Sequence, residues 1–215
     1  KGKNLEFSLL KKLMPELSAL GIKSIFIAGT GEPTLHPNFI EIIKLIKKNN
    51  IDVALNTNML AYSKEKIEMT LEYLSWIRIS INAATPKIYS KIHNCAEKNF
   101  EKVIENIITA VKYKKDKKLN TTIGSQIVLI DDNISEPLKL AKLIKSIGVD
   151  YFSVKPYNEH HNHLNKNQIS TTKITEDYLN ALEKNLKKLE TPDFKVILRK
   201  LAFKLSKQKQ KNYTA

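Results

Sequence analysis

The sequence alternates between short apolar runs and longer segments whose apolar residues recur at helical spacing. The runs are rich in β-branched residues and nearly continuous, which is typical of strands buried on both faces in a parallel sheet. They fall at residues 24–28, 51–55, 76–81, 121–130 and 151–154, and 194–198 is a candidate for a sixth. Stripes such as Phe39, Ile42, Ile43 and Ile46 predict a helix between successive strands.

This alternation predicts the fold class. Repeats of strand, helix and strand are βαβ units, and right-handed crossovers arrange them in a parallel sheet that is either open or curled into a barrel. In both arrangements ligands bind at the carboxyl ends of the strands. The residues that directly follow each strand are therefore the candidates for function.

Composition narrows the class of protein. The chain has 215 residues, of which 42% are hydrophobic, and this suffices for the core of one domain. No apolar run reaches the roughly 18 residues that a membrane span needs, and the first residues lack the apolar segment of a secretory signal. We therefore expect a soluble, cytoplasmic protein. The single cysteine excludes an internal disulfide and any multi-cysteine cofactor held by this chain alone.

The formal charge of +14 raises the question of nucleic-acid binding. The chain has only two arginines, Arg78 and Arg199, although proteins that read base sequence rely on arginine forks. Much of the excess charge lies at 194–215, where no acidic residue occurs. We interpret this segment as a solvated tail or helix face. Nucleic-acid binding is the weaker alternative, and a steep loss of affinity with salt would support it.

The first strand is followed by the run GTGEPTLHP, residues 29–37. Its two glycines allow a tight turn that exposes backbone N–H and C=O groups to a ligand. Glu32 can accept a hydrogen bond from an ammonium group. The run resembles the GGEP-type motif of the radical S-adenosylmethionine (SAM) enzymes. That motif binds the amino group of SAM, and the resemblance assigns this contact to Gly29, Thr30, Gly31 and Glu32.

Two further strand ends agree with this resemblance in order and spacing. The sequence Asn56-Thr57-Asn58 is similar to the family's TNG segment, with Asn58 in place of a glycine; asparagine tolerates positive φ better than most residues. The segment RISINAAT, residues 78–85, resembles the family's RVSLDGAT. Ser80 and Asn82 share one face of the strand, and the matching family positions bond a carboxylate and the ribose. By resemblance, Asn56, Asn58, Ser80 and Asn82 are cofactor-binding residues.

The last strands supply weaker candidates. Gln126 in the fourth strand is a further cofactor-binding candidate if it faces the barrel interior. Lys155 and Tyr157 follow the fifth strand and are candidates for substrate binding, although a surface role suits Lys155 equally well.

Three histidines lie in the sequence EHHNH at 159–163, but neighbouring residues of a loop point in different directions. We predict no metal site in this chain and structural roles for His36, His93 and Cys95.

The family's chemistry needs a CxxxCxxC loop whose three thiolates hold a [4Fe–4S] cluster, and the chain has no such loop. The resemblance therefore implies a fragment. Residues 1–192 are expected to be a radical SAM core barrel, an α/β, partial (β/α)6 TIM-like barrel of parallel strands that lacks its first strand. Residues 193–215 are expected to be a basic segment leading to a missing cysteine-rich domain of the SPASM type.

The resemblance also implies a function. With a cluster held by cysteines outside this chain, the enzyme would convert SAM into a 5′-deoxyadenosyl radical that abstracts a substrate hydrogen, whereas this fragment alone would be inactive. A small molecule or a peptide would be the substrate, and a flavodoxin or ferredoxin the electron donor. Two alternatives stay open: a non-catalytic degenerate barrel that binds a ligand, and an unrelated TIM-barrel lyase with Glu32 and Lys155 as acid and base.

Overall fold

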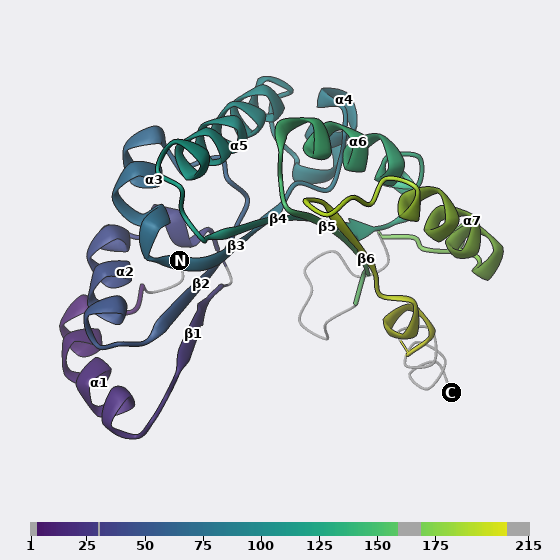
Figure 1. Cartoon of the computed structure of the whole chain (residues 1–215). Helices are drawn as coiled ribbons and strands as arrows, with labels where there is room; N and C mark the ends of the chain where they lie inside the picture. The colour runs from purple at the N-terminus through teal and green to yellow at the C-terminus, as the bar shows by residue number, and fades with distance from the viewer. Residues whose placement is uncertain (1–3, 30, 159–168, 206–215) are drawn as a thin grey trace. The chain divides into compact units, whose positions relative to one another are not determined.

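The computed structural model describes residues 4–29, 31–158 and 169–205 (Figure 1). Its strands lie in one sheet whose order follows the sequence, and this confirms the predicted parallel α/β fold. Every predicted strand is present: β1 (Ser24–Ile27), β2 (Asp52–Thr57), β3 (Leu74–Ser80), β4 (Thr122–Leu129), β5 (Tyr151–Pro156) and β6 (Lys195–Leu198).

Helices fill the intervals between the strands, as the apolar stripes predict. They are α1 (Phe7–Ala19), α2 (Phe39–Lys48), α3 (Lys64–Thr70), α4 (Pro86–His93), α5 (Lys98–Asp116), α6 (Pro137–Ile147) and α7 (Glu176–Lys187). The described part of the chain also contains the 3₁₀ turns η1 (Pro33–Leu35), η2 (Leu71–Tyr73) and η3 (Asp131–Asn133).

The chain divides into two compact units. Unit 1 comprises Lys1–Ile79 and Lys102–Ile123, and unit 2 comprises Ser80–Glu101 and Gly124–Ala215. The candidate residues are distributed over both units, and each unit is described by itself.

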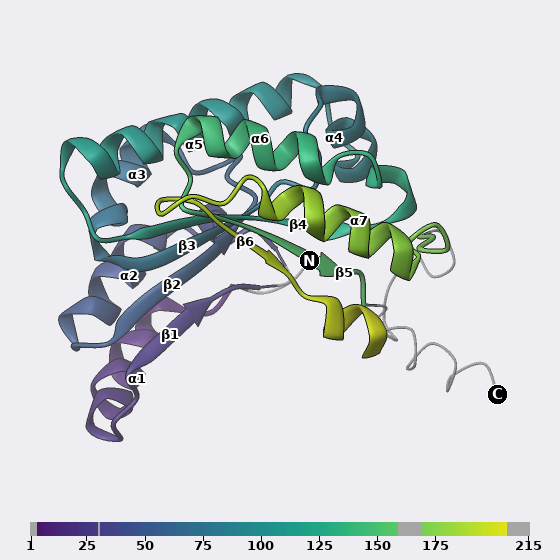
Figure 2. The same cartoon turned by 45° about the vertical axis from the view of Figure 1, so that its right-hand side comes forward.

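In unit 1, β1 pairs in parallel with β2, and β2 pairs in parallel with β3. Helices α1, α2 and α3 lie on the same side of these strands (Figures 1 and 2). Side chains such as Val53, Leu55 and Ile77 are fully buried, whereas Phe26, which alternates with Ile25 and Ile27 along β1, is 47% exposed. The strands of unit 1 thus have one closely packed face and one face with partly exposed side chains.

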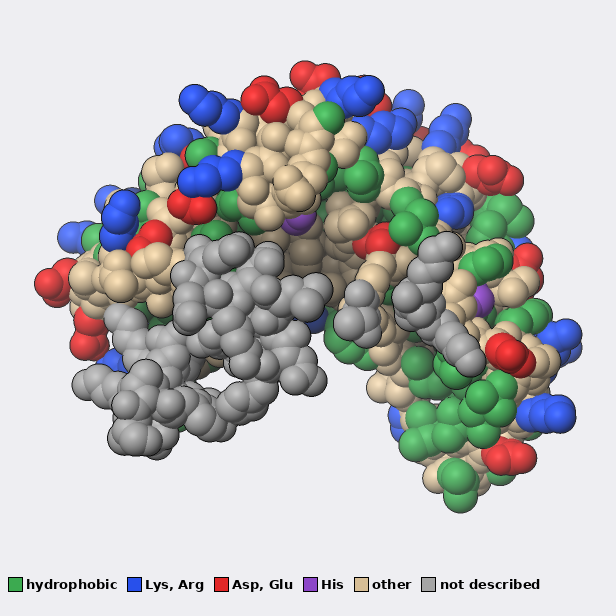
Figure 3. All heavy atoms as spheres, turned by 180° about the vertical axis from the view of Figure 1, so that it is seen from behind, with side chains coloured by type: hydrophobic (Ala, Val, Ile, Leu, Met, Phe, Trp, Pro, Cys, Tyr) green, Lys and Arg blue, Asp and Glu red, His purple; other side chains and the backbone are tan. Residues whose placement is uncertain are grey.

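Strand β1 comes first in the sheet order, so it is an edge strand among the described residues. Hydrophobic side chains gather on the surface formed by α1 and β1 (Figure 3). The exposed ones on these elements and their flanks are Leu5, Leu9, Leu20, Ile22 and Phe26. The prediction that the family's first strand is missing concerns this edge, and it stays a prediction.

In unit 2, β5 pairs in parallel with both β4 and β6. Gly124 lies opposite Tyr151 in this register, and a Cβ atom at Gly124 would come within 1.9 Å of the Tyr151 ring. Only glycine fits there, because the ring covers the backbone of β4. Helix α6 ends at Gly148, whose φ of 98° is the left-handed conformation that favours glycine at a helix end.

The predicted boundary at residue 193 stays a prediction, although the residues after it join the sheet through β6. Phe194 and Phe203 are buried. Lys200 and Lys204 form ion pairs with the α7 residues Glu183 and Glu176. Within the described part, this basic segment therefore packs on its own unit, and residues 206–215 lie outside the description. No described helix is both long and apolar enough to cross a membrane.

Helix α4 ends with His93, whose ring stacks on Tyr89 at 4.3 Å between centroids. Its Nε2 donates to the carbonyl of Ile81, 3.1 Å away. Burial lowers the pKa of His93, and the bond to Ile81 opposes this shift only in part. The structural role predicted for His93 agrees with these contacts.

The lowered pKa of His93 predicts a loss of stability in acid. The unfolded chain binds the proton near the ordinary value of 6.5, whereas the folded chain binds it only at lower pH. The free energy of unfolding should therefore fall as pH drops below 6.5, and His93→Gln should reduce that fall. Urea unfolding at pH 7.5 and 5.5 measures both. An equal or larger loss in the variant would contradict the assignment.

Candidate functional site

The carboxylate of Glu32 is the centre of the first strand-end cluster, in unit 1. Its Oε1 accepts from Thr34 N–H at 3.2 Å, from the Thr34 hydroxyl at 2.7 Å and from the Thr57 hydroxyl at 2.5 Å. Its Oε2 accepts from the backbone N–H of Asn58 at 2.7 Å. One side chain thus joins the loop after β1 to the carboxyl end of β2.

These four bonds limit what else Glu32 can bind. An ionised carboxylate offers about four lone-pair sites on its two oxygens. Oε1 already accepts three bonds and Oε2 accepts one, so capacity for a ligand donor remains at Oε2. The predicted contact with an ammonium group is compatible with this geometry. In the structure, however, Glu32 serves mainly to hold the loop after β1 against the end of β2.

Lys66 supports the same loop from α3. Its Nζ donates to the carbonyl of Thr34 at 2.6 Å and to that of Ala61 at 3.4 Å. Thr34 is fully buried, and Glu32 caps the 3₁₀ turn η1 that contains it. Sequence reasoning missed Lys66 and the role of Thr57, because their partners are distant in sequence and no local motif names them.

The glycines of this loop are exposed, and their backbone is open. Among the described residues, a Cβ atom on Gly31 would meet nothing within 4 Å, and one on Gly29 would meet only the Gly31 nitrogen at 3.8 Å. For neither glycine is a φ in the left-handed range recorded. Packing and backbone conformation therefore do not require glycine here, whereas a ligand that approaches the backbone would. Thr30, the remaining candidate of the loop, lies outside the described residues.

Asn56, near the end of β2, and Asn58, just after it, make different contacts. Asn56 accepts a hydrogen bond at Oδ1 from Nε of Arg78 at 3.2 Å. Asn58 uses its backbone N–H for Glu32 and its Oδ1 to accept from Leu60 N–H. The positive φ of this turn is at Met59, at 66°, and not at Asn58. The glycine-like conformation that the resemblance suggested for Asn58 is therefore displaced by one residue.

Asn82 has the corresponding position in unit 2, after β3. Its φ of 60° lies in the left-handed region, which asparagine tolerates. Its Oδ1 accepts from Val128 N–H at 2.8 Å, and its carbonyl accepts from Asn133 Nδ2 at 2.9 Å. Because Oδ1 is engaged, the side-chain amide can offer a ligand its Nδ2 donors.

Asn133 and Glu136 hold this turn, and sequence reasoning missed both. Asn133 is fully buried; it donates also to the Val128 carbonyl and accepts from Ile130 N–H. Glu136, 1% exposed, accepts from Ala84 N–H at 2.9 Å and from the Thr85 hydroxyl at 3.1 Å. The only sequence signal is that two polar residues stand three apart beside an apolar helix, which is also common on surfaces.

The electrostatics of Glu136 agree with a structural role. Burial alone would raise its pKa, but the bond from Ala84 N–H, the nearby Lys139 and the Thr85 hydroxyl outweigh burial and keep the pKa below the ordinary value. Glu136 is therefore an anion at neutral pH that accepts hydrogen bonds within unit 2.

The remaining candidates in unit 2 lie along neighbouring strands. Ser80 is half-buried, and Gln126 is 3% exposed, with its carbonyl accepting from Ile81 N–H. Lys155 and Tyr157 are half-buried, and both take part in interactions. Ser153 lies opposite Gln126 in the register of β4 and β5, and its buried hydroxyl has no hydrogen-bond partner among the described residues. The EHHNH segment at 159–163 lies outside the described residues.

The described residues do not fit an iron–sulfur cluster. Among them, no three His, Cys, Asp or Glu side chains are placed to share a metal ion. Cys95 is half-buried beside Ser90, which donates to its carbonyl. His36 uses both ring nitrogens for backbone groups, of Leu5 and Asn38.

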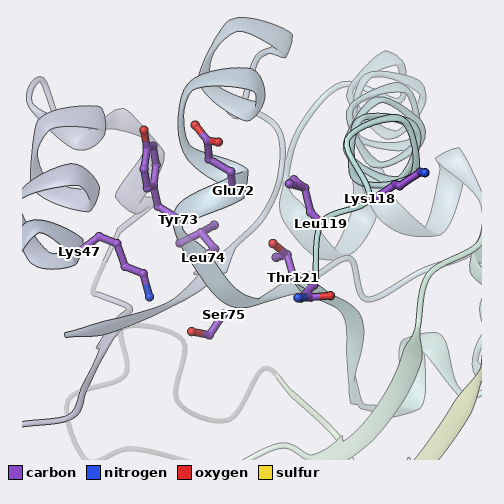
Figure 4. A pocket seen from close by; sticks show the side chains of 9 residues that line it. Lys47, Glu72, Tyr73, Leu74, Ser75, Lys118, Leu119 and Thr121 are labelled. Atoms are coloured by element: carbon purple, nitrogen blue, oxygen red, sulfur yellow. The ribbon is translucent and has the colours of Figure 1, made fainter. Parts of the chain in front are cut away.

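A depression of about 510 Å³ lies at the amino ends of the strands in unit 1, away from the candidate residues at their carboxyl ends (Figure 4). Its lining comes from η2, the start of β3 and residues 118–121 before β4. Ligands of parallel α/β sheets bind at the carboxyl ends of the strands. This depression at the amino ends is therefore not the candidate site.

The Glu32 cluster predicts that Glu32→Gln destabilises the chain. The amide can no longer accept all four bonds, and an unsatisfied buried donor costs about 1–3 kcal/mol. Glu16→Gln, an exposed change on α1, is the matched control and should alter stability by less than about 0.5 kcal/mol. Urea unfolding of both variants measures this. An equal change in the free energy of unfolding in both variants would show that the Glu32 cluster does not stabilise the fold.

Comparison with known proteins identifies the family of this chain. The family model described as the Radical SAM superfamily matches residues 1–144. A "Probable GTP 3′,8-cyclase" of Thermococcus kodakarensis is 32% identical over 114 residues, covering 53% of this chain and 36% of the relative. An S-adenosyl-L-methionine-dependent tRNA 4-demethylwyosine synthase of Methanocaldococcus jannaschii is 31% identical over 140 residues, covering 65% and 41%. The chain spans less than half of either relative.

Among solved structures, Streptococcus suis SuiB bound to S-adenosylmethionine superposes with a TM-score of 0.73. The match covers 93% of this chain and 45% of SuiB at 14% identity, so it shows a shared fold. The family match over more than half of the chain carries the assignment: the chain belongs to the radical SAM superfamily, whose enzymes use SAM and a [4Fe–4S] cluster.

Proposed function

We propose that this chain is the SAM-binding core of a radical SAM enzyme and that the loop after β1 binds the amino group of SAM. The observation that carries the proposal is the open backbone at Gly31, where neither packing nor φ requires a glycine. The Glu32 cluster fixes this loop in place, so the backbone is preorganised for a ligand.

The roles of the individual residues follow from their remaining hydrogen-bonding capacity. Glu32 Oε2 can accept one bond from the ammonium group of SAM, and the exposed backbone of Gly29 and Gly31 can supply further acceptors. We propose Thr30 as part of the same loop and Asn58 as its support through Glu32. The Oδ1 atom of Asn56 already accepts a hydrogen bond from Arg78. A direct contact between SAM and Asn56 Oδ1 would therefore be the second hydrogen bond at that atom.

For unit 2 we propose that Asn82 donates through Nδ2 to a ribose hydroxyl of SAM, since Oδ1 is engaged by Val128. We also propose Ser80 and Gln126 as cofactor contacts. Lys155 and Tyr157 are proposed as substrate contacts at the end of β5. These roles rest on the family resemblance and on the position of each residue at a strand end.

The chemistry proposed for the whole enzyme is reductive cleavage of SAM to a 5′-deoxyadenosyl radical at a cluster whose ligands this chain does not supply. SuiB has been solved bound to its precursor peptide SuiA, and this supports a peptide as one substrate class beside small molecules. We propose a flavodoxin or ferredoxin as the electron donor. Because the chain belongs to the superfamily, the alternative of an unrelated barrel lyase is wrong.

Gly31→Ala tests the proposed contact. The added methyl group meets open space, so the folded chain should be as stable as the wild type or up to about 1 kcal/mol more stable. The methyl group would occupy the ligand's place, and we expect the dissociation constant for SAM to rise at least about tenfold. Calorimetric titration with SAM and thermal unfolding measure the two effects.

Leu35→Ala is the matched control, because it truncates an exposed side chain of the same loop. It should leave the affinity for SAM unchanged. Unchanged affinity in Gly31→Ala would contradict the proposed contact. A wild-type chain that does not bind SAM would favour the degenerate barrel instead.

A further inference from the structure

Four side chains on the less packed face of unit 1 form a cluster, and three of them, Phe26, Trp76 and Arg78, have no part in the proposed SAM contacts. The rings of Phe26 on β1 and Trp76 on β3 lie 5.1 Å apart between centroids, tilted by 31°. The guanidinium of Arg78 lies 5.3 Å from the Phe26 centroid and 5.4 Å from that of Trp76. Asn56 on β2 accepts from its Nε. We call these residues the Arg78 platform.

The sheet register explains how the platform forms. Phe26 lies opposite Ala54 on β2, and Ala54 lies opposite Trp76 on β3. The small side chain of Ala54 lets two rings from strands on either side of β2 lean together across it. Asn56 lies opposite Arg78 in the same register, and their hydrogen bond fixes the guanidinium beside the rings.

The platform is not part of the hydrophobic core. Phe26 is 47% exposed, and Trp76 and Arg78 are half-buried, whereas Ile77 and Ile79 on β3 are fully buried. Core packing therefore does not account for the aromatic pair. The guanidinium lies over two rings and is hydrogen-bonded at Nε, and its fork of N–H donors suits it to bind a carboxylate or a phosphate.

The charge of the platform is positive. None of its four members is acidic, and Arg78 is the single charged one. Two residues before Ala54 on β2, Asp52 is paired with Lys47 at 2.8 Å. Arg78 also takes part in an interaction beyond those with the rings and Asn56. A guanidinium has N–H donors and no acceptor, so within the platform its chemistry favours an oxyanion over a cation.

We propose that the Arg78 platform binds the substrate of the enzyme, a small molecule in which a carboxylate or a phosphate adjoins a flat ring. The ring stacks on the exposed face of Phe26, and the oxyanion lies against the guanidinium of Arg78. Recognition depends on the charge and plane of the guanidinium, which the rings and Asn56 hold in place. The proposal rests on the proposed function, since it names the substrate class of the same enzyme.

Trp76 is the single tryptophan of the chain, so its fluorescence reports directly on the platform. We would titrate the chain at constant ionic strength with phenyl phosphate, benzoate, benzyl alcohol and inorganic phosphate. Phenyl phosphate, benzoate or both should change the emission saturably, at least about tenfold more tightly than benzyl alcohol or inorganic phosphate. Which of the two binds more tightly identifies the oxyanion as phosphate or carboxylate. Equal affinity for all four probes, or no saturable change, would overturn the proposal.

Variants identify the side chain responsible. Arg78→Gln should raise the dissociation constant of the tighter probe at least about tenfold. Arg78→Lys should restore only part of the affinity, because lysine keeps the charge but lacks the planar fork of N–H donors. Arg199→Gln, at the other arginine, is the matched control and should bind as the wild type does. Circular dichroism checks that each variant is folded. Full binding by folded Arg78→Gln would overturn the proposal.

SAM titration of the same variants separates the platform from the cofactor site. Arg78→Gln should lose much less affinity for SAM than for the probe, although it removes the partner of the cofactor candidate Asn56. Gly31→Ala should bind the probe as the wild type does. Loss of SAM affinity in Arg78→Gln equal to its loss of probe affinity would make the platform a cofactor contact and overturn the proposal. If the wild type binds the probe but not SAM, the proposed function fails and the platform stands as a binding surface without it.

Discussion

The geometry of unit 1 at its proposed SAM contact depends on one carboxylate. Glu32 accepts four hydrogen bonds, and these tie the loop after β1 to the residues that end β2. A loop between a strand and a helix would otherwise sample many conformations, and ordering it on binding would cost conformational entropy. The hydrogen bonds of the Glu32 cluster order the loop when the chain folds. The exposed backbone of Gly31 is therefore held in one conformation before a ligand binds.

Unit 2 uses buried polar side chains in the same way. Asn133 donates to the backbone carbonyl of Asn82, and Glu136 accepts from the backbone N–H of Ala84, and these bonds support the left-handed conformation of Asn82. Buried polar groups without partners are costly, so networks of this kind are stable only when each member is satisfied. Each strand end therefore combines a rigid inner layer of hydrogen bonds with outer groups that retain capacity for a ligand. Polar residues thus serve both to bind a ligand and to hold the backbone around it. The two kinds of residue therefore cannot be told apart from the sequence alone.

The sequence was sufficient for the fold because its two hydrophobic periods are distinct. The run at 24–28 and the stripe through Phe39, Ile43 and Ile46 predict a strand and a helix, and the structure has β1 and α2 there. The motif residues could be found because they are adjacent in sequence. Asn133, Glu136 and the Thr57–Glu32 bond could not, since each joins residues 25 or more positions apart. The positive φ at Met59 was equally hidden, because it arises from the Thr57 and Asn106 contacts and not from residue type.

Backbone amide spectra of the glycines test most directly whether the loop after β1 receives SAM. The chain has six glycines, so ¹⁵N-glycine labelling gives a spectrum with few signals. On titration with SAM, the signals of Gly29 and Gly31 should shift together and saturate, while those of Gly21 and Gly148, at the ends of α1 and α6, should stay in place. Stationary signals from Gly29 and Gly31 at saturating SAM would contradict the account, whatever the other glycines do.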